Sequence, residues 1–97
     1  MTYYAVTRVR GERWDLARGM REQEDWHQHV VFMDGLVDDG FVVLGGPLGD
    51  GSEILLIVNG ENEGQIRARF RDDPWTPMDL LRVAKIEPWE ILLSGDQ

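Results

Sequence analysis

Two runs of apolar residues, 41–44 (FVVL) and 54–58 (ILLIV), constrain the fold more than any other feature of the sequence. Neither run alternates between apolar and polar residues, as a strand with one face in water would. Gly49, Asp50 and Gly51 lie between the runs and suit the positive backbone angles of a hairpin turn. The sequence therefore predicts two neighbouring strands in a sheet that is covered on both faces.

Two further strands are predicted at the ends of the chain. Residues 3–10 are rich in aromatic and β-branched side chains, which favour a strand, and Gly11 follows them. Residues 81–86 form another short strand, and the tail that follows can continue extended as far as Leu93.

The first helix is predicted from the spacing of its apolar residues. Trp26, His29, Met33 and Leu36 recur at i, i+3, i+7 and i+10, which places them on one helical face. Gly40 is well placed to end this helix. Three acidic residues near its start suit the positive end of the helix dipole, namely Glu22, Glu24 and Asp25.

A shorter second helix is predicted after the apolar pair of strands. Asn62 followed three residues later by Gln65 resembles a capping pair, and Ile66 and Phe70 give this helix one face to bury. The resulting order is β-α-β-β-α-β, an α+β class fold with a ferredoxin-like, four-stranded antiparallel sheet.

The need to cover both faces of this sheet predicts an oligomer. Two helices cover only one face of a four-stranded sheet, and a chain of 97 residues buries only roughly two-thirds of its unfolded surface. A second copy of the chain is the simplest cover for the other face. We therefore expect a single domain, residues 1–97, that forms a homodimer through the sheet face.

The charge of the chain argues against two classes of partner. Eighteen acidic against ten basic residues give a formal charge of −8, which repels nucleic acid and anionic lipid surfaces. No stretch approaches the roughly 18 apolar residues that a membrane helix needs. The first residues show no secretory signal pattern, so we expect a cytoplasmic protein.

Only two histidines are present, and they lie two residues apart on the first predicted helix. This spacing turns their side chains about 200° from each other, so they do not readily share a metal ion. His27 lies on the face of Asp34 and Asp38 and is expected to be a solvated surface residue. His29 lies on the apolar face, where it is either a core residue or a general base.

The ring of His29 has two candidate carboxylate partners. Asp25 lies four residues earlier and could hold the ring as a local helix pair. Asp73 lies in the Asp-Asp-Pro-Trp turn, residues 72–75, where an acid before a proline commonly bonds to nearby backbone N–H groups. The residues alone leave both partners, and both roles of Asp73, open.

No pattern for a bound cofactor or metal ion is present. Residues 45–51 hold four glycines, but they match neither GxGxxG nor the P-loop, and they lead into a strand rather than a helix. The chain has no cysteine, which excludes disulfides and thiolate ligands, and its carboxylates form no calcium-binding loop. We expect no cofactor and no metal.

Several motifs together resemble those of the YciI-like (YCII-related) family, small proteins with a ferredoxin-like fold of the dimeric α+β barrel type. The motifs are His29 with Gly40 eleven residues later, Gly46-Pro47-Leu48, Asp73-Pro74-Trp75 and Pro88-Trp89. The resemblance implies a candidate active site made of the helix histidine and the aspartate of the Asp-Pro-aromatic turn, here His29 and Asp73. Many members have an arginine where this chain has Trp26, so the pocket wall expected here is aromatic.

The resemblance also implies proton transfer as the chemistry. Some relatives resemble a dehydrochlorinase that acts on a chlorinated hydroxyhydroquinone, which predicts a cofactor-free His-Asp dyad acting on a small cyclic or phenolic substrate. The expected substrate contacts are Trp26, Gly46, Pro47 and Trp75, and Trp14 is a candidate to close over the pocket.

Two alternatives to an enzyme stay open. One is a binding module that uses the same fold and pocket for a small ligand without chemistry. The other is a structural or assembly partner, in which His29 packs fully buried against Met33 and Leu36 with no cavity beside it.

Overall fold

The structure is a computed structural model that describes residues 2–95. Its elements are β1 (Thr2–Arg10), a 3-10 turn η1 (Met20–Glu22), α1 (Trp26–Asp38), β2 (Val42–Leu48), β3 (Glu53–Gly60), α2 (Glu63–Arg71) and β4 (Leu81–Pro88). All neighbouring strands are antiparallel, and their order across the sheet is β2-β3-β1-β4. This arrangement confirms the predicted ferredoxin-like α+β fold.

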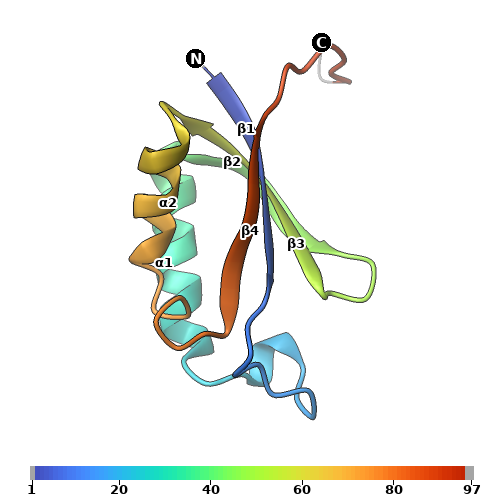
Figure 1. Cartoon of the computed structure of the whole chain (residues 1–97), viewed down its shortest axis with the longest axis vertical. Coiled ribbons are helices and arrows are strands. Elements are labelled where there is room, and N and C mark those ends of the chain that lie inside the picture. Colours follow the sequence, from blue (N-terminus) through green and yellow to red (C-terminus); the bar gives the residue numbers. More distant parts are fainter. Residues whose placement is uncertain (1, 96–97) are drawn as a thin grey trace.

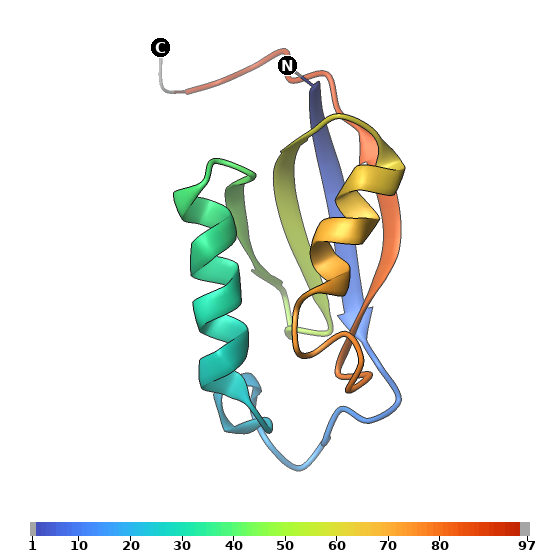
Figure 2. The ribbon, with the colours of Figure 1, turned by 90° about the vertical axis from the view of Figure 1, so that its left-hand side faces the viewer.

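Both helices lie on the same face of the sheet, as Figures 1 and 2 show from two directions. The core between helices and sheet, here called the apolar cluster, consists of Val6, Leu36, Phe41, Val42, Leu56, Val58, Ile66 and Phe70. Within residues 2–95, the opposite face of the sheet carries no helix (Figure 1).

The face that points away from the helices is apolar across its middle. The strand register places Leu44, Ile57 and Ala5 in one row. Leu44 is 68% exposed, whereas Ile57 lines a shallow hollow with Ala5 and Trp89. Trp89 donates its backbone N–H to the Tyr3 carbonyl, 2.9 Å away, where the chain leaves β4. A single chain therefore leaves apolar side chains of this face in water.

The end of α1 follows from its glycine. Gly40 has a φ of 83° and donates its N–H to the Val37 carbonyl, while Phe41 donates to the Leu36 carbonyl, each over 3.0 Å. These two bonds form the Schellman motif, which satisfies the last carbonyls of a helix. Phe41 and Leu36 both belong to the apolar cluster, so the same turn holds the approach to β2 against the core.

The two helices begin in different ways. At α2 the prediction is confirmed, because Asn62 Oδ1 accepts the Gln65 N–H over 2.8 Å and Gln65 Oε1 accepts the Glu61 N–H over 3.1 Å. At α1 the acidic residues expected near the helix start lie before its first turn, and Asp25 is the N-cap. Asp25 has a left-handed φ of 58° and ends the preceding turn, so the helix begins only at Trp26.

Strand β2 extends further than the predicted apolar run. It continues through Gly45, Gly46 and Pro47, and it lies at the edge of the sheet, where the missing N–H of a proline is tolerated. A Cβ atom at Gly45 would lie 2.5 Å from the Leu56 side chain. Glycine at this position therefore permits close approach between β2 and β3 beside the site described next.

Candidate functional site

Three elements bring buried polar groups together at one end of the helix–sheet layer. His29 lies near the start of α1, Asp73 follows the end of α2, and Arg8 lies near the end of β1. Figure 2 shows that α1 begins at the same end of the molecule where α2 and β1 finish. The exposed fractions of the three residues are 7%, 0% and 1%. Three ionisable side chains therefore share a site that is almost fully buried.

The structure brings His29 and Asp73 into direct contact. His29 Nδ1 lies 2.9 Å from Oδ2 and 3.0 Å from Oδ1 of Asp73. An ionised carboxylate only accepts hydrogen bonds, so Nδ1 carries a proton and donates it. The other candidate partner, Asp25, contributes only its backbone carbonyl, which accepts the His29 backbone N–H over 3.0 Å.

Asp73 combines the two roles that its sequence context suggests. Its Oδ1 accepts the Trp75 backbone N–H over 2.9 Å, which closes the turn around Pro74. Its Oδ2 also accepts Arg8 Nη1 over 2.7 Å. The carboxylate is thus held by a turn, a strand and a helix at once, so its position is fixed.

The charge of Asp73 follows from these neighbours. Burial by itself raises the pKa of its carboxyl, but hydrogen bonds from His29 and Arg8, with the positive charge of Arg8, outweigh burial and hold the pKa below its ordinary value. Asp73 is therefore a carboxylate at neutral pH, and Arg8 is the cation that balances it.

Arg8 is the site residue that the sequence reasoning missed. Its Nη2 donates to Thr76 Oγ1 over 3.2 Å, and its guanidinium lies 5.2 Å from the centre of the Phe70 ring. A signal was present in the sequence, since alternation along β1 places Arg8 on the same face as Tyr4 and Val6. An arginine on the core face of a strand requires a buried anion, which is Asp73 here.

Trp75 supports the histidine ring from beneath. The two rings are stacked, with centroids 3.9 Å apart and planes 4° from parallel. Trp75 is fully buried, and its Nε1 donates to the Glu24 carbonyl over 2.7 Å. Trp14 packs edge-on against Trp75 with centroids 5.8 Å apart. The prediction that Trp14 closes over the pocket is wrong, because this largely buried side chain packs behind Trp75.

A cavity of about 200 Å³ adjoins the histidine ring. Its lining is Met20, Trp26, His29, Met33, Asp34, Val37, Val42, Gly45, Gly46, Pro47, Ile54 and Leu56. Trp26, Gly46 and Pro47 thus lie where a pocket wall was predicted, whereas Trp75 is outside this lining. No lysine or arginine occurs among the described lining residues, and Asp34 is the only carboxylate. The cavity beside His29 differs from the structural alternative, which expected none.

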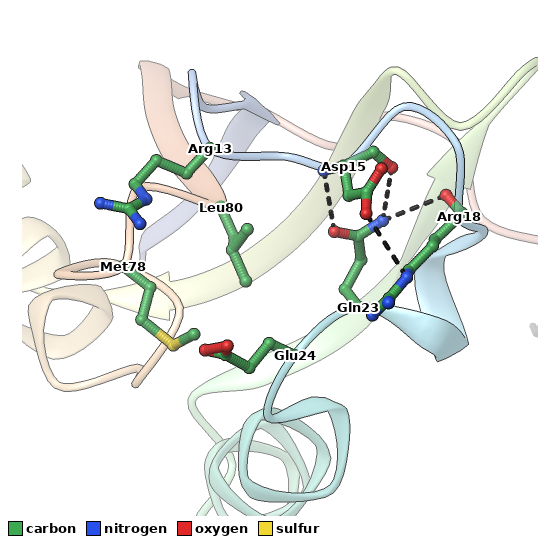
Figure 3. Close-up of a pocket in the computed structure, with 7 residues that line it drawn as sticks. All are labelled: Arg13, Asp15, Arg18, Gln23, Glu24, Met78 and Leu80. Atoms are coloured by element: carbon green, nitrogen blue, oxygen red, sulfur yellow. Dashed lines mark hydrogen bonds and ion pairs between the residues drawn. The ribbon is translucent and has the colours of Figure 1, made fainter.

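A larger hollow of about 430 Å³ lies under the loop between β1 and α1 (Figure 3). Gln23, only 4% exposed, spans this loop: its Oε1 accepts the Asp15 N–H, and its Nε2 donates to the carbonyls of Asp15 and Arg18. Arg18 also pairs with the Asp15 carboxylate over 3.4 Å. These side chains fix the conformation of the loop that carries Trp14. The polar groups in the lining of this hollow are therefore engaged in holding the loop.

Two other sequence expectations concern metals and membranes. His27 is exposed on α1, away from the His29 ring partners. Within residues 2–95, no group of three or more histidine, aspartate or glutamate side chains is placed to hold a metal ion. In the same part of the chain, no helix has the length and apolar character needed to span a membrane.

No protein-family model matches the sequence, and no curated protein matches it either. A solved structure has the same fold: 5-chloro-2-hydroxyhydroquinone dehydrochlorinase from Burkholderia phenoliruptrix AC1100, in complex with 2,5-dihydroxybenzoquinone. The TM-score is 0.66 at 20% sequence identity, and the match covers 93% of this chain and 94% of that one. The ferredoxin-like fold is therefore shared over nearly the whole length of both chains.

Proposed function

We propose that this protein is a cofactor-free enzyme in which His29 and Asp73 act as a general-base dyad on a small, uncharged ring compound, with elimination as the reaction. The observation that carries the proposal is the contact between a buried carboxylate and His29 Nδ1 beside a cavity that His29 lines. Positioned acid–base groups of this kind typically contribute about 10² to 10⁴ in rate.

The proposed step uses both nitrogens of the ring. Nδ1–H stays bonded to Asp73, while Nε2 removes a proton from the substrate. The proton comes from the ring hydroxyl beside the chlorine-bearing carbon and is delivered to that carbon, which gives a keto tautomer with an sp3 carbon–chlorine bond. Nε2 then removes the proton of the ring hydroxyl opposite the new ketone. The electron pair of that O–H bond forms a second C=O bond, the ring double bond shifts to the chlorine-bearing carbon, and chloride leaves with the electrons of the carbon–chlorine bond. The imidazolium then returns its proton to water, so the net change is loss of HCl and no oxidant or reductant is consumed.

The cavity chemistry supports an uncharged ring as the substrate. An apolar cavity of about 150 Å³ accommodates benzene, so about 200 Å³ has room for one substituted ring. Trp26 offers an aromatic wall, and Asp34 disfavours an anionic ligand because no cation in the lining offsets it. The structural neighbour is named for a chlorinated hydroxyhydroquinone and binds a dihydroxybenzoquinone, which are rings of this size.

The test is chloride release from 5-chloro-2-hydroxyhydroquinone, followed without oxygen because hydroquinones oxidise in air. We expect turnover by the unmodified protein and a loss of about 10² to 10⁴ in His29→Ala. His27→Ala is the matched control, since His27 is exposed on the same helix, and it should retain full turnover. Unchanged turnover in His29→Ala would discard the dyad.

The cavity also fits the alternative of a binding module without chemistry. That function predicts saturable binding of hydroquinone, an uncharged ring at neutral pH, measured by calorimetry, together with no chloride release from the chlorinated ring. Loss of this binding in Trp26→Ala would locate the ligand in the cavity that Trp26 lines.

We also propose that the chain forms a homodimer through the open face of the sheet. The row of Leu44, Ile57 and Ala5 supports this, because it is apolar and Leu44 is largely exposed. Sedimentation at micromolar concentration should give a dimer, and Leu44→Lys should give a monomer. Val31→Lys, on an exposed position of α1, is the control that should remain dimeric. A stable monomer of the unmodified protein would contradict this assembly.

A further inference from the structure

Two nitrogen atoms of different residues meet one oxygen atom of Asp73. Arg8 Nη1 lies 2.7 Å and His29 Nδ1 lies 2.9 Å from the same Oδ2. The guanidinium of Arg8 is positively charged at every accessible pH. A proton added to His29 would therefore place a second cation on a carboxylate that is already neutralised.

Burial strengthens the repulsion between Arg8 and a protonated His29. Arg8 is 1% exposed and Asp73 is fully buried, so water does little to screen the charges at the site. Arg8 and Asp73 together carry no net charge, and protonation of His29 would leave one uncompensated positive charge there. An uncompensated buried charge is among the costliest features of a protein interior.

Other groups around the His29 ring either favour or disfavour its positively charged form. The start of α1, the positive end of its dipole, disfavours an imidazolium at His29. The Trp75 face beneath the ring and the carboxylate of Asp34 in the cavity lining favour one. Glu24, Asp25 and Asp34 are all exposed, so water and salt screen these carboxylates. Among residues 2–95, Arg8 is the fully buried cation that contacts Asp73.

We infer that Arg8 is a positioning residue that keeps His29 uncharged, with its proton on Nδ1 and Nε2 open to the cavity. The position of Arg8 is fixed by Thr76 Oγ1 on one side and the Phe70 ring on the other. The inference deepens the proposed function and rests on it for its catalytic meaning. The charge of His29, however, is measurable without any substrate.

The first test uses the unmodified protein. Nitrogen-15 spectra of the two histidine rings at pH 7.5 should show His29 as the neutral form protonated on Nδ1, with exposed His27 as the internal reference. An imidazolium signal for His29 at this pH would overturn the inference. This result does not depend on whether any variant folds.

The second test removes the charge of Arg8 while keeping its length. In Arg8→Met the midpoint of the His29 titration should move up by about one pH unit or more, because the carboxylate then has no other cation. The pH profile of chloride release should move in the same direction. Arg8→Lys keeps the charge and should restore the midpoint close to that of the unmodified protein.

Arg10→Met is the matched control. Arg10 lies on the same strand, with its guanidinium 5.0 Å from the centre of the Trp14 ring and its Nη2 bonded to the Asp50 carbonyl. It should leave the His29 midpoint unchanged. A folded Arg8→Met protein with the midpoint of the unmodified protein would overturn the inference. Absence of turnover with a neutral His29 would instead contradict only the proposed enzyme function.

Discussion

The two ends of the layer between helices and sheet are built from different chemistry. One end is the part of the apolar cluster around Leu36 and Phe41, where the buried side chains are all apolar. The other end is the site cluster, defined as Arg8, His29, Asp73 and Trp75, which buries three ionisable groups within the same layer. Burial at the first end stabilises the fold directly, whereas at the second end it removes charges from water and depends on their pairing.

This difference indicates where function constrains the chain. Well-packed apolar side chains in place of a buried ion pair are often neutral or stabilising, so stability alone does not require Arg8 and Asp73. Folded proteins break the rules of a consistent core mainly at functional sites. The stacked ring of His29, which lines the cavity, lies at the end of the layer where those rules are broken.

The largest expected effect comes from breaking the site cluster on one side only. Asp73→Ala leaves the Arg8 guanidinium buried without its carboxylate, which should lower the free energy of unfolding by about 3–5 kcal/mol. The double variant Arg8→Met with Asp73→Leu removes both charges and should recover most of this loss while lacking chloride release. Urea unfolding at fixed protein concentration measures the free energy of unfolding of both variants. A double variant no more stable than Asp73→Ala would contradict the expectation that the unpaired charge of Arg8 causes the loss.

A truncation in the apolar cluster should lower the free energy of unfolding by a similar amount, but without a dependence on pH. Leu36→Ala removes a side chain that is 3% exposed and should lower the free energy of unfolding by about 2–5 kcal/mol. Because no charge is involved, this loss should be the same at pH 7 and pH 4, and the His29 titration should not move. A change in that titration would show that the two ends are not independent.

The fold was predictable because its signals are local. The unalternating runs of β2 and β3, the apolar spacing of α1 and the glycine after it each act within a few residues, and each specifies the element in which it lies. The site was predictable only in part. His29 and Asp73 lie 44 residues apart and Arg8 and Asp73 lie 65 apart, so no local spacing records these contacts. The resemblance supplied the first pair, while Arg8 was overlooked.

Acid should weaken the site cluster by a smaller amount than truncation does. The folded state holds the pKa of Asp73 below its ordinary value near 4, so as the pH falls the unfolded chain takes up the proton first. The stability from this carboxylate is present above about pH 4 and is lost as the pH falls further. The difference in free energy of unfolding between the unmodified protein and Asp73→Asn should therefore shrink below pH 4.

Asp72→Asn is the control for this acid effect. Asp72 is the exposed neighbour of Asp73, and its replacement should leave the dependence of stability on pH parallel to that of the unmodified protein. Other carboxylates whose pKa is also lowered, such as exposed Asp39 and half-buried Asp79, are present in both proteins and cancel. A constant difference between the unmodified protein and Asp73→Asn down to pH 2 would contradict the assignment to Asp73.

The smallest effect belongs to the start of α2, at the opposite end of that helix from the turn that follows it (Figure 2). Asn62→Ala removes the acceptor of the Gln65 N–H and should lower the free energy of unfolding by about 1 kcal/mol. Glu61→Ala is the control, because only the backbone of Glu61 takes part in this cap. A cap acts on its own helical turn, so the His29 ring signals should be identical in both variants. Displaced ring signals in Asn62→Ala alone would mean that α2 transmits strain to the turn holding Asp73, and that the two ends act as one unit.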